Sequence, residues 1–449
     1  MEMVVRNADW ILTDSSSSPV SGDILIRDGV IEHVGGRVQP AARVPTVDAQ
    51  GCLVVPGLVN THHHMFQSLT RATGHQEELF GWLGSLWGRW ARHDPDWMAA
   101  ASAIACAELL LSGCTTTADH HYLPDSADND AIEAQAEVAG ALGIRLVQAV
   151  GSMDVSDQDG GLAPSLLCEA TDAYLERAAK LTASAHDPLP DARRRIALAP
   201  CHPLAVSDGY IRQATELARS SGVRLHTHVA EARDEEAATV AATGYRPVDL
   251  LADRGFLGPD AWLAHAVHLS DEDIETLAAS GTSVATCPSS NLRLGSGIAR
   301  VRDLVDASVP VGLGVDGSAS NDSGNMLQEA RMLMLTSRAG GVSSGLSARQ
   351  TLEIATAGGA RVLGWPEIGS IAPGFRGDLA IFPRDDVTGI GTETDVIAGL
   401  LLSPPAAARH VIVDGELVVQ DGRLVNADLA EILAHARSVI ARNLAARPA

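Results

Sequence analysis

The chain has 449 residues and a formal net charge of −23, with 33 Lys and Arg residues against 56 Asp and Glu residues. At roughly 100–200 residues per domain, this length allows two to four domains, or one large α/β barrel with an addition. The acidic balance argues against a nucleic-acid-binding protein and against one that docks on anionic membranes, because both need basic patches.

Cysteine usage and the N-terminal sequence indicate a reducing compartment. The six cysteines are scattered and no two are spaced as Cys-x-x-Cys, so a secreted disulfide framework is not expected. Residues 1–10 carry an acid at position 2 and lack the basic segment and apolar core of a signal peptide. No run of about 18 uncharged apolar residues is present. We therefore expect a cytoplasmic protein without a membrane partner.

The two ends of the chain are predicted to form strands. Residues 1–57 and 368–425 contain short segments of β-branched residues that are broken by Gly, Asp and Asn. A final helix is predicted over residues 428–446. Because the two β-rich segments have a similar residue pattern, we expect one small β-sandwich domain built from residues 1–57 and 368–449.

Residues 58–367 are predicted to form a (β/α)₈ barrel, because eight short apolar segments alternate with helical stretches. The predicted helices cover residues 97–112, 129–142, 165–184, 207–220, 247–254, 271–280, 299–307 and 325–338. Eight such units over about 280 residues match the count and length of this barrel. A doubly wound open sheet is the alternative. It would need a glycine-rich nucleotide loop after the first strand, where the sequence has HHHMFQ.

Polar side chains gather at the predicted carboxyl ends of four barrel strands, where barrel enzymes carry their active sites. In strand order they are His62, His63 and His64, then His226 and His228, then His265 and His268, and finally Asp316. The strand period of two lets His62 and His64 face the barrel mouth together, while His63 points away. An isolated His-x-His is more often a polar strand end. Here the His-x-His occurs together with a second histidine cluster and an aspartate at the ends of later barrel strands, and this combination indicates a divalent metal site.

Four segments of the chain resemble the amidohydrolase superfamily. They are PGLVNTHHH (56–64), HTHVAE (226–231), LAHAVHL (263–269) and GVDGSASND (314–322). Within it, the chain is similar to the mononuclear branch that deaminates or dechlorinates N-heteroaromatic rings. The resemblance covers nearly the whole chain and implies a barrel with a split β domain. The metal ligands that it implies are His62, His64, His228 and Asp316, and the catalytic residues are Glu231, His265 and Asp316. His226 and His268 are then flanking residues.

One metal per subunit is expected. Lys180 is the only lysine, and it lies in the predicted helix 165–184. Binuclear relatives often bridge their metals with a carbamylated lysine at the end of strand four, where this chain has Ala-Pro-Cys-His at residues 199–202. Three histidines and one aspartate suit Zn²⁺, although Fe²⁺ is chemically acceptable.

The residue types suit hydrolytic deamination. Zn²⁺ lowers the pKa of a bound water towards about 7, which supplies hydroxide at neutral pH. Asp316 can accept the water proton, His265 can orient the hydroxide, and Glu231 can protonate the ring nitrogen beside the reacting carbon. An intact Glu231 favours loss of an amine, because loss of chloride does not need the same proton delivery.

Four residues are candidates for substrate binding: Gln67, His121, Cys201 and Ser320. Gln67 stands where guanine-deaminase-like relatives bind a purine ring, and its amide both donates and accepts hydrogen bonds. Cys201 stands where relatives place Arg or His, which leaves room for a ring substituent, and alternation should point its neighbour His202 elsewhere. The long loop 76–97 holds four of the seven tryptophans. We expect most of these to pack in the core and one or two to cover a flat ring.

These observations predict a zinc-dependent deaminase of a purine-like free base, with 8-oxoguanine converted to urate and ammonia as the preferred reaction. An isoxanthopterin deaminase or an s-triazine aminohydrolase or chlorohydrolase is the alternative within the fold. A non-catalytic scaffold is a remote alternative, because every implied ligand is present. The family resemblance also implies a homo-oligomer, a dimer or higher.

Overall fold

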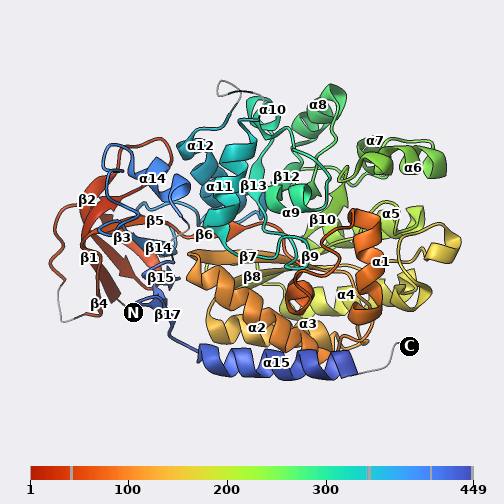
Figure 1. Cartoon of the computed structure of the whole chain (residues 1–449), viewed down its shortest axis with the longest axis horizontal. Coiled ribbons are helices and arrows are strands. Elements are labelled where there is room, and N and C mark those ends of the chain that lie inside the picture. Colours follow the sequence, from red (N-terminus) through yellow and green to blue (C-terminus); the bar gives the residue numbers. More distant parts are fainter. Residues whose placement is uncertain (1, 41–43, 340, 342–344, 405–406, 446–449) are drawn as a thin grey trace.

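A closed barrel of eight parallel strands forms the centre of the molecule (Figure 1). The computed structural model describes residues 2–40, 44–339, 341, 345–404 and 407–445. The barrel strands are β6 (Leu58–Asn60), β7 (Cys114–His121), β8 (Arg145–Val150), β9 (Arg194–Leu198), β10 (Arg224–Val229), β11 (Ala261–His265), β12 (Ser283–Thr286) and β13 (Val311–Leu313). Nearly all their residues are buried, because helices cover the barrel outside while side chains fill its interior.

Helices alternate with the barrel strands and surround them (Figure 1). They are α1 (Leu79–Trp90), α2 (Pro95–Leu111), α3 (Asp130–Leu142), α4 (Thr171–Ala185), α5 (Asp208–Ser221), α6 (Arg233–Thr243), α7 (Pro247–Asp253), α8 (Asp271–Ser280), α9 (Pro288–Arg293), α10 (Val301–Asp306), α11 (Met326–Thr336), α12 (Ala348–Glu353) and α13 (Gly359–Val362). Each of the eight predicted barrel helices is present. Their ends shift by a few residues, and the largest shift is in the helix predicted over 165–184, which begins at Thr171. The predicted loop over 76–97 was wrong in part, because α1 forms within it despite three glycines and several aromatic residues, which are weak helix formers.

A nine-stranded mixed sheet joins the two ends of the chain beside the barrel. Its strands are β1 (Glu2–Ile11), β2 (Val20–Arg27), β3 (Val30–Val34), β4 (Thr46–Asp48), β5 (Cys52–Pro56), β14 (Leu379–Pro383), β15 (His410–Val413), β16 (Glu416–Gln420) and β17 (Arg423–Leu424). The N-terminal strand β5 pairs antiparallel with the C-terminal strand β14. The predicted fold, a barrel with a small β-sandwich domain from both chain ends, is confirmed. The domain boundaries at residues 57 and 367 stay predictions.

The last helix leaves the β domain and returns to the barrel. After α14 (Val396–Leu402) and the final strands, α15 (Leu429–Ala445) lies along α2 (Figure 1). Ala436 and Val439 of α15 pack with Trp97 and Ala101 of α2 in one apolar cluster. The C-terminal helix therefore packs against the outer helical layer of the barrel.

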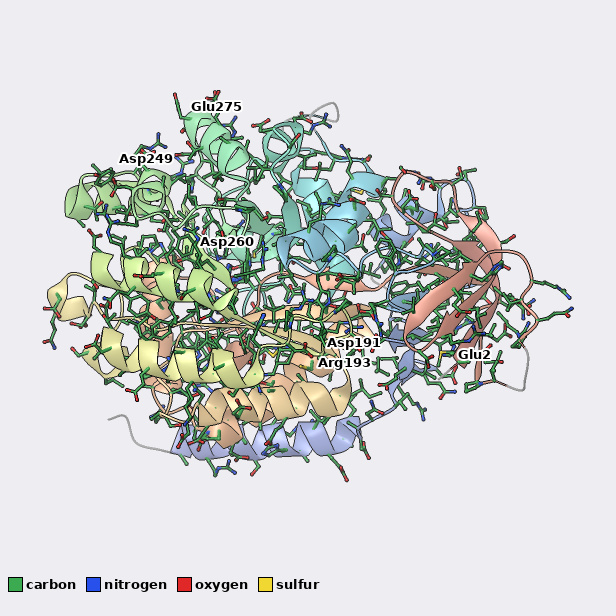
Figure 2. The ribbon with its side chains drawn as sticks, turned by 180° about the vertical axis from the view of Figure 1, so that it is seen from behind. Glu2, Asp191, Arg193, Asp249, Asp260 and Glu275 are labelled. Carbon is green, nitrogen blue, oxygen red and sulfur yellow. The ribbon has the colours of Figure 1, made fainter. Side chains whose placement is uncertain are left out.

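Charged side chains lie mainly on the surface. Asp191, Asp249 and Glu275 are exposed, and Glu275 lies at the edge of the molecule in Figure 2. Among the described residues, no helix combines the length and the apolar character that crossing a membrane would require.

Candidate active site

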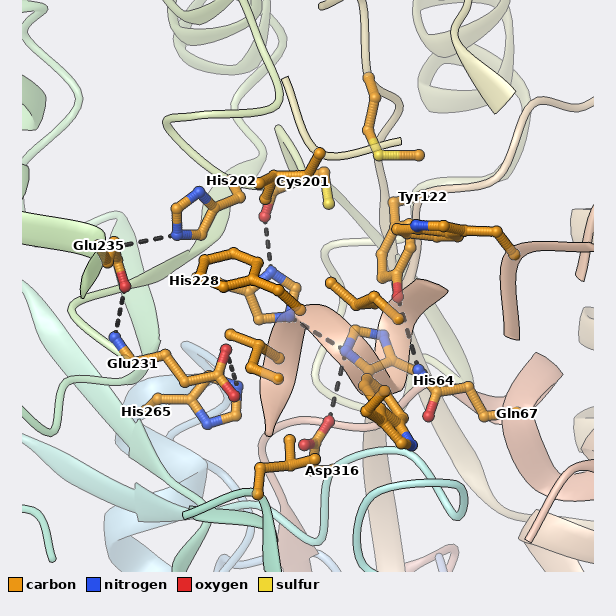
Figure 3. Close-up of a pocket in the computed structure, with 18 residues that line it drawn as sticks. His64, Gln67, Tyr122, Cys201, His202, His228, Glu231, Glu235, His265 and Asp316 are labelled. Atoms are coloured by element: carbon orange, nitrogen blue, oxygen red, sulfur yellow. Dashed lines mark hydrogen bonds and ion pairs between the residues drawn. The ribbon is translucent and has the colours of Figure 1, made fainter. Parts of the chain in front are cut away.

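A pocket lies at the carboxyl ends of the barrel strands (Figure 3). Its polar lining is His64, Gln67, Tyr122, Cys201, His202, His228, Glu231, Glu235, His265 and Asp316. Its apolar lining is Leu79, Phe80, Trp82, Leu83, Trp87, Met153, Leu162 and Leu294. The polar groups converge from the barrel strands, whereas α1 supplies much of the apolar cover. Such a mixture suits a flat aromatic ring, because the polar side chains can hydrogen-bond to its polar edge while the apolar side chains cover its face.

The backbone turns sharply where the strands deliver these residues. Ala230, His265, Ala266 and Asp316 have positive φ angles of 50°, 69°, 48° and 62°. Non-glycine residues adopt this left-handed conformation at a cost, so it persists only where surrounding contacts hold it. Four such residues at the ends of three strands around one pocket mark it as a functional site.

Two histidines at the bottom of the pocket point unprotonated ring nitrogens at each other. His64 donates its Nδ1–H to the carbonyl of His120 at 2.7 Å, and His228 donates its Nδ1–H to the carbonyl of Cys201 at 2.6 Å. Burial lowers the pKa of both rings, so each is neutral and its Nε2 carries a lone pair. These Nε2 atoms lie only 3.1 Å apart. Two lone pairs at this distance repel each other unless a cation lies between them.

The spacing of the remaining donors matches a tetrahedral metal. Oδ1 of Asp316 is 3.4 Å from Nε2 of His62 and 3.4 Å from Nε2 of His64. Metal bonds of 2.0–2.1 Å in a tetrahedron place neighbouring donor atoms about 3.3 Å apart. The Nε2 atom of His62 is buried without a hydrogen-bond partner among the described residues. The residues present therefore fit a single divalent ion.

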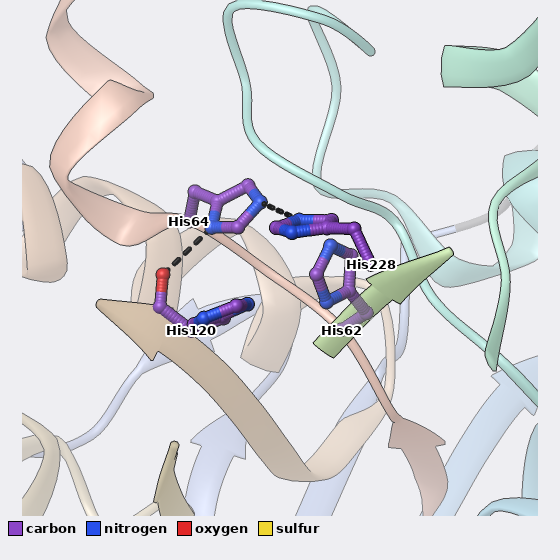
Figure 4. Close-up of side chains that lie close together, drawn as sticks. All are labelled: His62, His64, His120 and His228. Atoms are coloured by element: carbon purple, nitrogen blue, oxygen red, sulfur yellow. Dashed lines mark hydrogen bonds between the residues drawn. The ribbon is translucent and has the colours of Figure 1, made fainter. Parts of the chain in front are cut away.

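His120 is a further histidine beside these donors (Figure 4). Its ring stacks on that of His228 with centroids 4.8 Å apart, and its Nε2–H donates to the carbonyl of Ala199. Its Nδ1 has no hydrogen-bond partner among the described residues. The sequence analysis did not include His120 among the candidate ligands, but the structure groups it with His62, His64 and His228.

Asp316 is held by hydrogen bonds on both carboxylate oxygens. Oδ1 accepts from the backbone N–H of Gly317 at 2.7 Å, and Oδ2 accepts from the hydroxyls of Ser290 and Ser320. Burial alone would raise the pKa of Asp316, but the histidines around it, His62, His64 and His265, hold it well below its usual value. Ser320 therefore hydrogen-bonds to this carboxylate and is not among the described residues that line the pocket.

Glu231 and His265 face each other on the opposite side of the pocket. Oε2 of Glu231 lies 3.7 Å from Nε2 of His265, and the Nδ1–H of His265 donates to Oδ1 of Asn291 at 2.9 Å. Burial raises the pKa of Glu231 to about 7, so its carboxyl group exchanges a proton near neutral pH. Burial lowers the pKa of His265, but the charges of Glu231 and Asp316 outweigh this effect and raise it.

A second carboxylate fixes the turn that carries Glu231. Glu235, at the start of α6, accepts hydrogen bonds from the backbone N–H groups of Ala230 and Glu231, both at 2.6 Å. Its Oε1 also lies 3.1 Å from Nε2 of His202. Our expectation that His202 points elsewhere was wrong, because β9 ends at Leu198 and strand alternation does not continue beyond it.

The predicted substrate-binding residues differ in where they lie. Gln67 and Cys201 line the pocket, and Gln67 donates its Nε2–H to the hydroxyl of Tyr122 at 3.5 Å. The Oε1 atom of Gln67 is buried without a partner among the described residues, as expected where a ligand supplies the missing donor. A side chain at Gly317 would collide with this amide. Burial raises the pKa of the Cys201 thiol, which therefore stays neutral.

His121 lies outside the pocket lining, whereas its neighbour Tyr122 belongs to it. The His121 ring packs between Phe66 and His93, with centroids 5.8 and 5.7 Å away. Sequence reasoning missed Tyr122, although strand alternation from the inward-facing His120 would have indicated it. Of the four tryptophans in the predicted loop, Trp82 and Trp87 line the pocket, which agrees with the expectation that one or two do so.

Comparison with known proteins places this geometry in a family. A family model described as "Amidohydrolase family" matches residues 53–423. The chain belongs to the amidohydrolase family. It is 42% identical to an 8-oxoguanine deaminase of Pseudomonas aeruginosa over 438 residues, which covers 97% of each chain. It is 35% identical to an isoxanthopterin deaminase of an unknown prokaryotic organism, covering 97% of this chain and 96% of that one.

Solved structures share the whole architecture of this amidohydrolase. The atrazine chlorohydrolase TrzN from Arthrobacter aurescens TC1, complexed with zinc, superimposes with a TM-score of 0.91 at 32% identity. That comparison covers 98% of this chain and 100% of the other. The barrel and the two-ended β domain are therefore features of both proteins.

Proposed function

We propose that this amidohydrolase is a zinc-dependent deaminase that hydrolyses 8-oxoguanine to urate and ammonia. The proposal rests on one observation: unprotonated histidine nitrogens and the Asp316 carboxylate lie together on one side of the pocket, and the Glu231–His265 pair lies on the other. The choice of substrate is supported by the 42% identity to an 8-oxoguanine deaminase along nearly the full chain.

The residues that would hold one Zn²⁺ per subunit are His62, His64, His228 and Asp316. When bound, the metal supplies a Lewis acid that makes water a nucleophile at neutral pH. Asp316 accepts a proton from the attacking water, and the two serines on its Oδ2 keep its Oδ1 turned towards the reacting centre.

Proton delivery to the substrate falls to Glu231. With a pKa near 7, its carboxyl group can donate a proton to the ring nitrogen beside the carbon that bears the amino group. The water oxygen adds to that carbon, and Asp316 passes the proton it took from water to the amino nitrogen. The C–N bond then breaks to release ammonia, while Glu231 recovers a proton from the hydroxyl group that becomes the new carbonyl. His265 has its Nδ1 proton fixed by Asn291, so its Nε2 faces Glu231 and stabilises the charge that develops.

Recognition of the ring is assigned to Gln67, Tyr122 and Cys201, with Trp82 and Trp87 as an apolar cover. The unpartnered Oε1 of Gln67 suits an N–H of a lactam edge. The small neutral Cys201 leaves space for the extra oxygen of an oxidised purine. His121 and Ser320 stay predictions, and their positions favour supporting roles.

A substrate panel tests this assignment. The initial rate of ammonia release is measured with 8-oxoguanine, guanine, cytosine, isoxanthopterin and hydroxyatrazine. We expect the highest kcat/KM with 8-oxoguanine. A higher value for isoxanthopterin or for a triazine would contradict the substrate, and purified protein unable to bind zinc would revive the scaffold alternative.

We also propose that the enzyme works in the cytoplasm as a homo-oligomer. The six cysteines are all free in the structure, which suits a reducing compartment. The oligomer rests on the family resemblance, and light scattering coupled to size-exclusion chromatography measures it.

A further inference from the structure

His226 lies between a proposed metal ligand and a backbone carbonyl. Its Nδ1 is 2.9 Å from the carbonyl oxygen of Trp262, and its Nε2 is 2.9 Å from Nδ1 of His62. Its ring stacks on the Trp262 indole with centroids 4.4 Å apart, and its side chain is buried at 1% exposure. The sequence alone had left His226 as a flanking residue.

These two contacts determine where the protons lie. A carbonyl oxygen can only accept, so the proton of His226 is on Nδ1. Burial disfavours a doubly protonated ring, and the rings that contact His226 are other imidazoles and an indole. Its Nε2 is therefore a lone-pair acceptor, and His62 must donate its Nδ1–H to it. This leaves the lone pair of His62 on Nε2, the atom that is 3.4 Å from Oδ1 of Asp316.

We propose that His226 is a positioning residue that fixes the proton of His62 on Nδ1 and thereby presents Nε2 to the metal. The other two histidine ligands reach the same state by donating to backbone carbonyls. His62 is the one of the three whose partner is a side chain, so its proton position depends on residue 226. The inference rests on the proposed metal site.

The test measures zinc affinity of the full-length protein by competition with a fluorescent zinc chelator. His226→Phe keeps a flat ring but offers no acceptor, so His62 loses the group that holds its proton. Removal of such a supporting partner lowers metal affinity by about 10–100-fold. His226→Gln should lose less, because an amide also combines a donor with an acceptor.

His268→Phe is the matched control, since His268 is the other flanking histidine and its ring bonds the carbonyl oxygen of Ser296 at 2.8 Å. We expect its zinc affinity to equal that of the wild type. If the wild type itself binds no zinc, the proposed function fails. If the wild type binds zinc and a folded His226→Phe variant binds it equally well, only this inference is overturned.

A measurement on the wild type covers the case in which His226→Phe does not fold. Nitrogen NMR of histidine-labelled, metal-free protein reports which ring nitrogen carries the proton. We expect His62 and His226 both to be neutral with the proton on Nδ1. A proton on Nε2 of His62 would overturn the inference.

Discussion

Glu231 is the residue whose chemistry the proposed reaction needs most directly. Glu231→Gln keeps the size of the side chain but removes its exchangeable acid proton. General acid catalysis contributes about 10²–10⁴-fold, so we expect kcat on 8-oxoguanine to fall by at least the lower figure. Steady-state kinetics measure the loss, and zinc content is the control because Glu231 is not a proposed ligand. A variant with wild-type kcat would remove Glu231 from the mechanism.

The residues at strand ends were predictable, whereas those beyond them were not. The period of two within a strand placed His62 and His64 together, and the barrel order brought the histidines of the fifth strand close to them. The choice of His228 as a ligand came from the family resemblance. His202 escaped prediction because it follows the end of β9, where the chain is irregular. His120 of β7 and Tyr122, which follows the end of that strand, obey the same alternation as His62 and His64. Only the structure shows that they lie beside the metal donors and the pocket.

At the scale of elements, the start of α6 organises the site. Glu235 holds the strained turn at Ala230 and Glu231 by accepting their N–H groups. Glu235→Gln replaces one of the accepting oxygens with an NH₂ group that faces a backbone N–H. A displacement of catalytic groups by about 1 Å can cost 10²-fold in rate, so we expect a fall in kcat of roughly 10–100-fold.

The matched control for this variant is Glu236→Gln, which changes the neighbouring, half-exposed carboxylate that pairs with Arg246. We expect zinc content to be unchanged in both variants and kcat to be unchanged in the control. Equal kcat for Glu235→Gln and wild type would show that the turn does not depend on this carboxylate.

The helices show the limits of prediction at the same scale. Helices with clear periodicity, such as α8, were predicted at their observed residues 271–280. The helix α1 was missed because its glycines and tryptophans lower intrinsic helix propensity, and its stability comes from packing over the pocket. The helix α6 was missed because its short run of Ala, Glu and Thr buries little surface. Both of these helices border the active site, because residues of each line the pocket.

At the scale of the molecule, a buried ion-pair cluster links the barrel to the β domain. Arg145 of β8 contacts Asp378 at 2.9 Å and Asp414 at 2.7 Å, and its side chain is fully buried. Arg145→Met would remove the cation from the buried carboxylate of Asp378, whereas Asp414 keeps its contacts with Arg376 and Arg193. Breaking a buried pair on one side typically costs about 3–5 kcal/mol of the free energy of unfolding.

Thermal and urea unfolding measure this effect. Arg212→Met is the control, because Arg212 and Asp253 form an exposed pair whose loss costs less than about 1 kcal/mol. If both variants unfold at the same temperature, the cluster at Arg145 does not stabilise the junction between the two domains.

The most direct test of the proposed function follows urate formation while zinc is restored. The protein is freed of metal with a chelator, titrated with Zn²⁺ and assayed with 8-oxoguanine. We expect no urate from the metal-free protein, a linear rise in rate up to one equivalent of zinc per subunit, and one ammonia for each urate. A zinc-loaded protein that forms no urate from 8-oxoguanine, or a rate that does not depend on metal, would contradict the proposal.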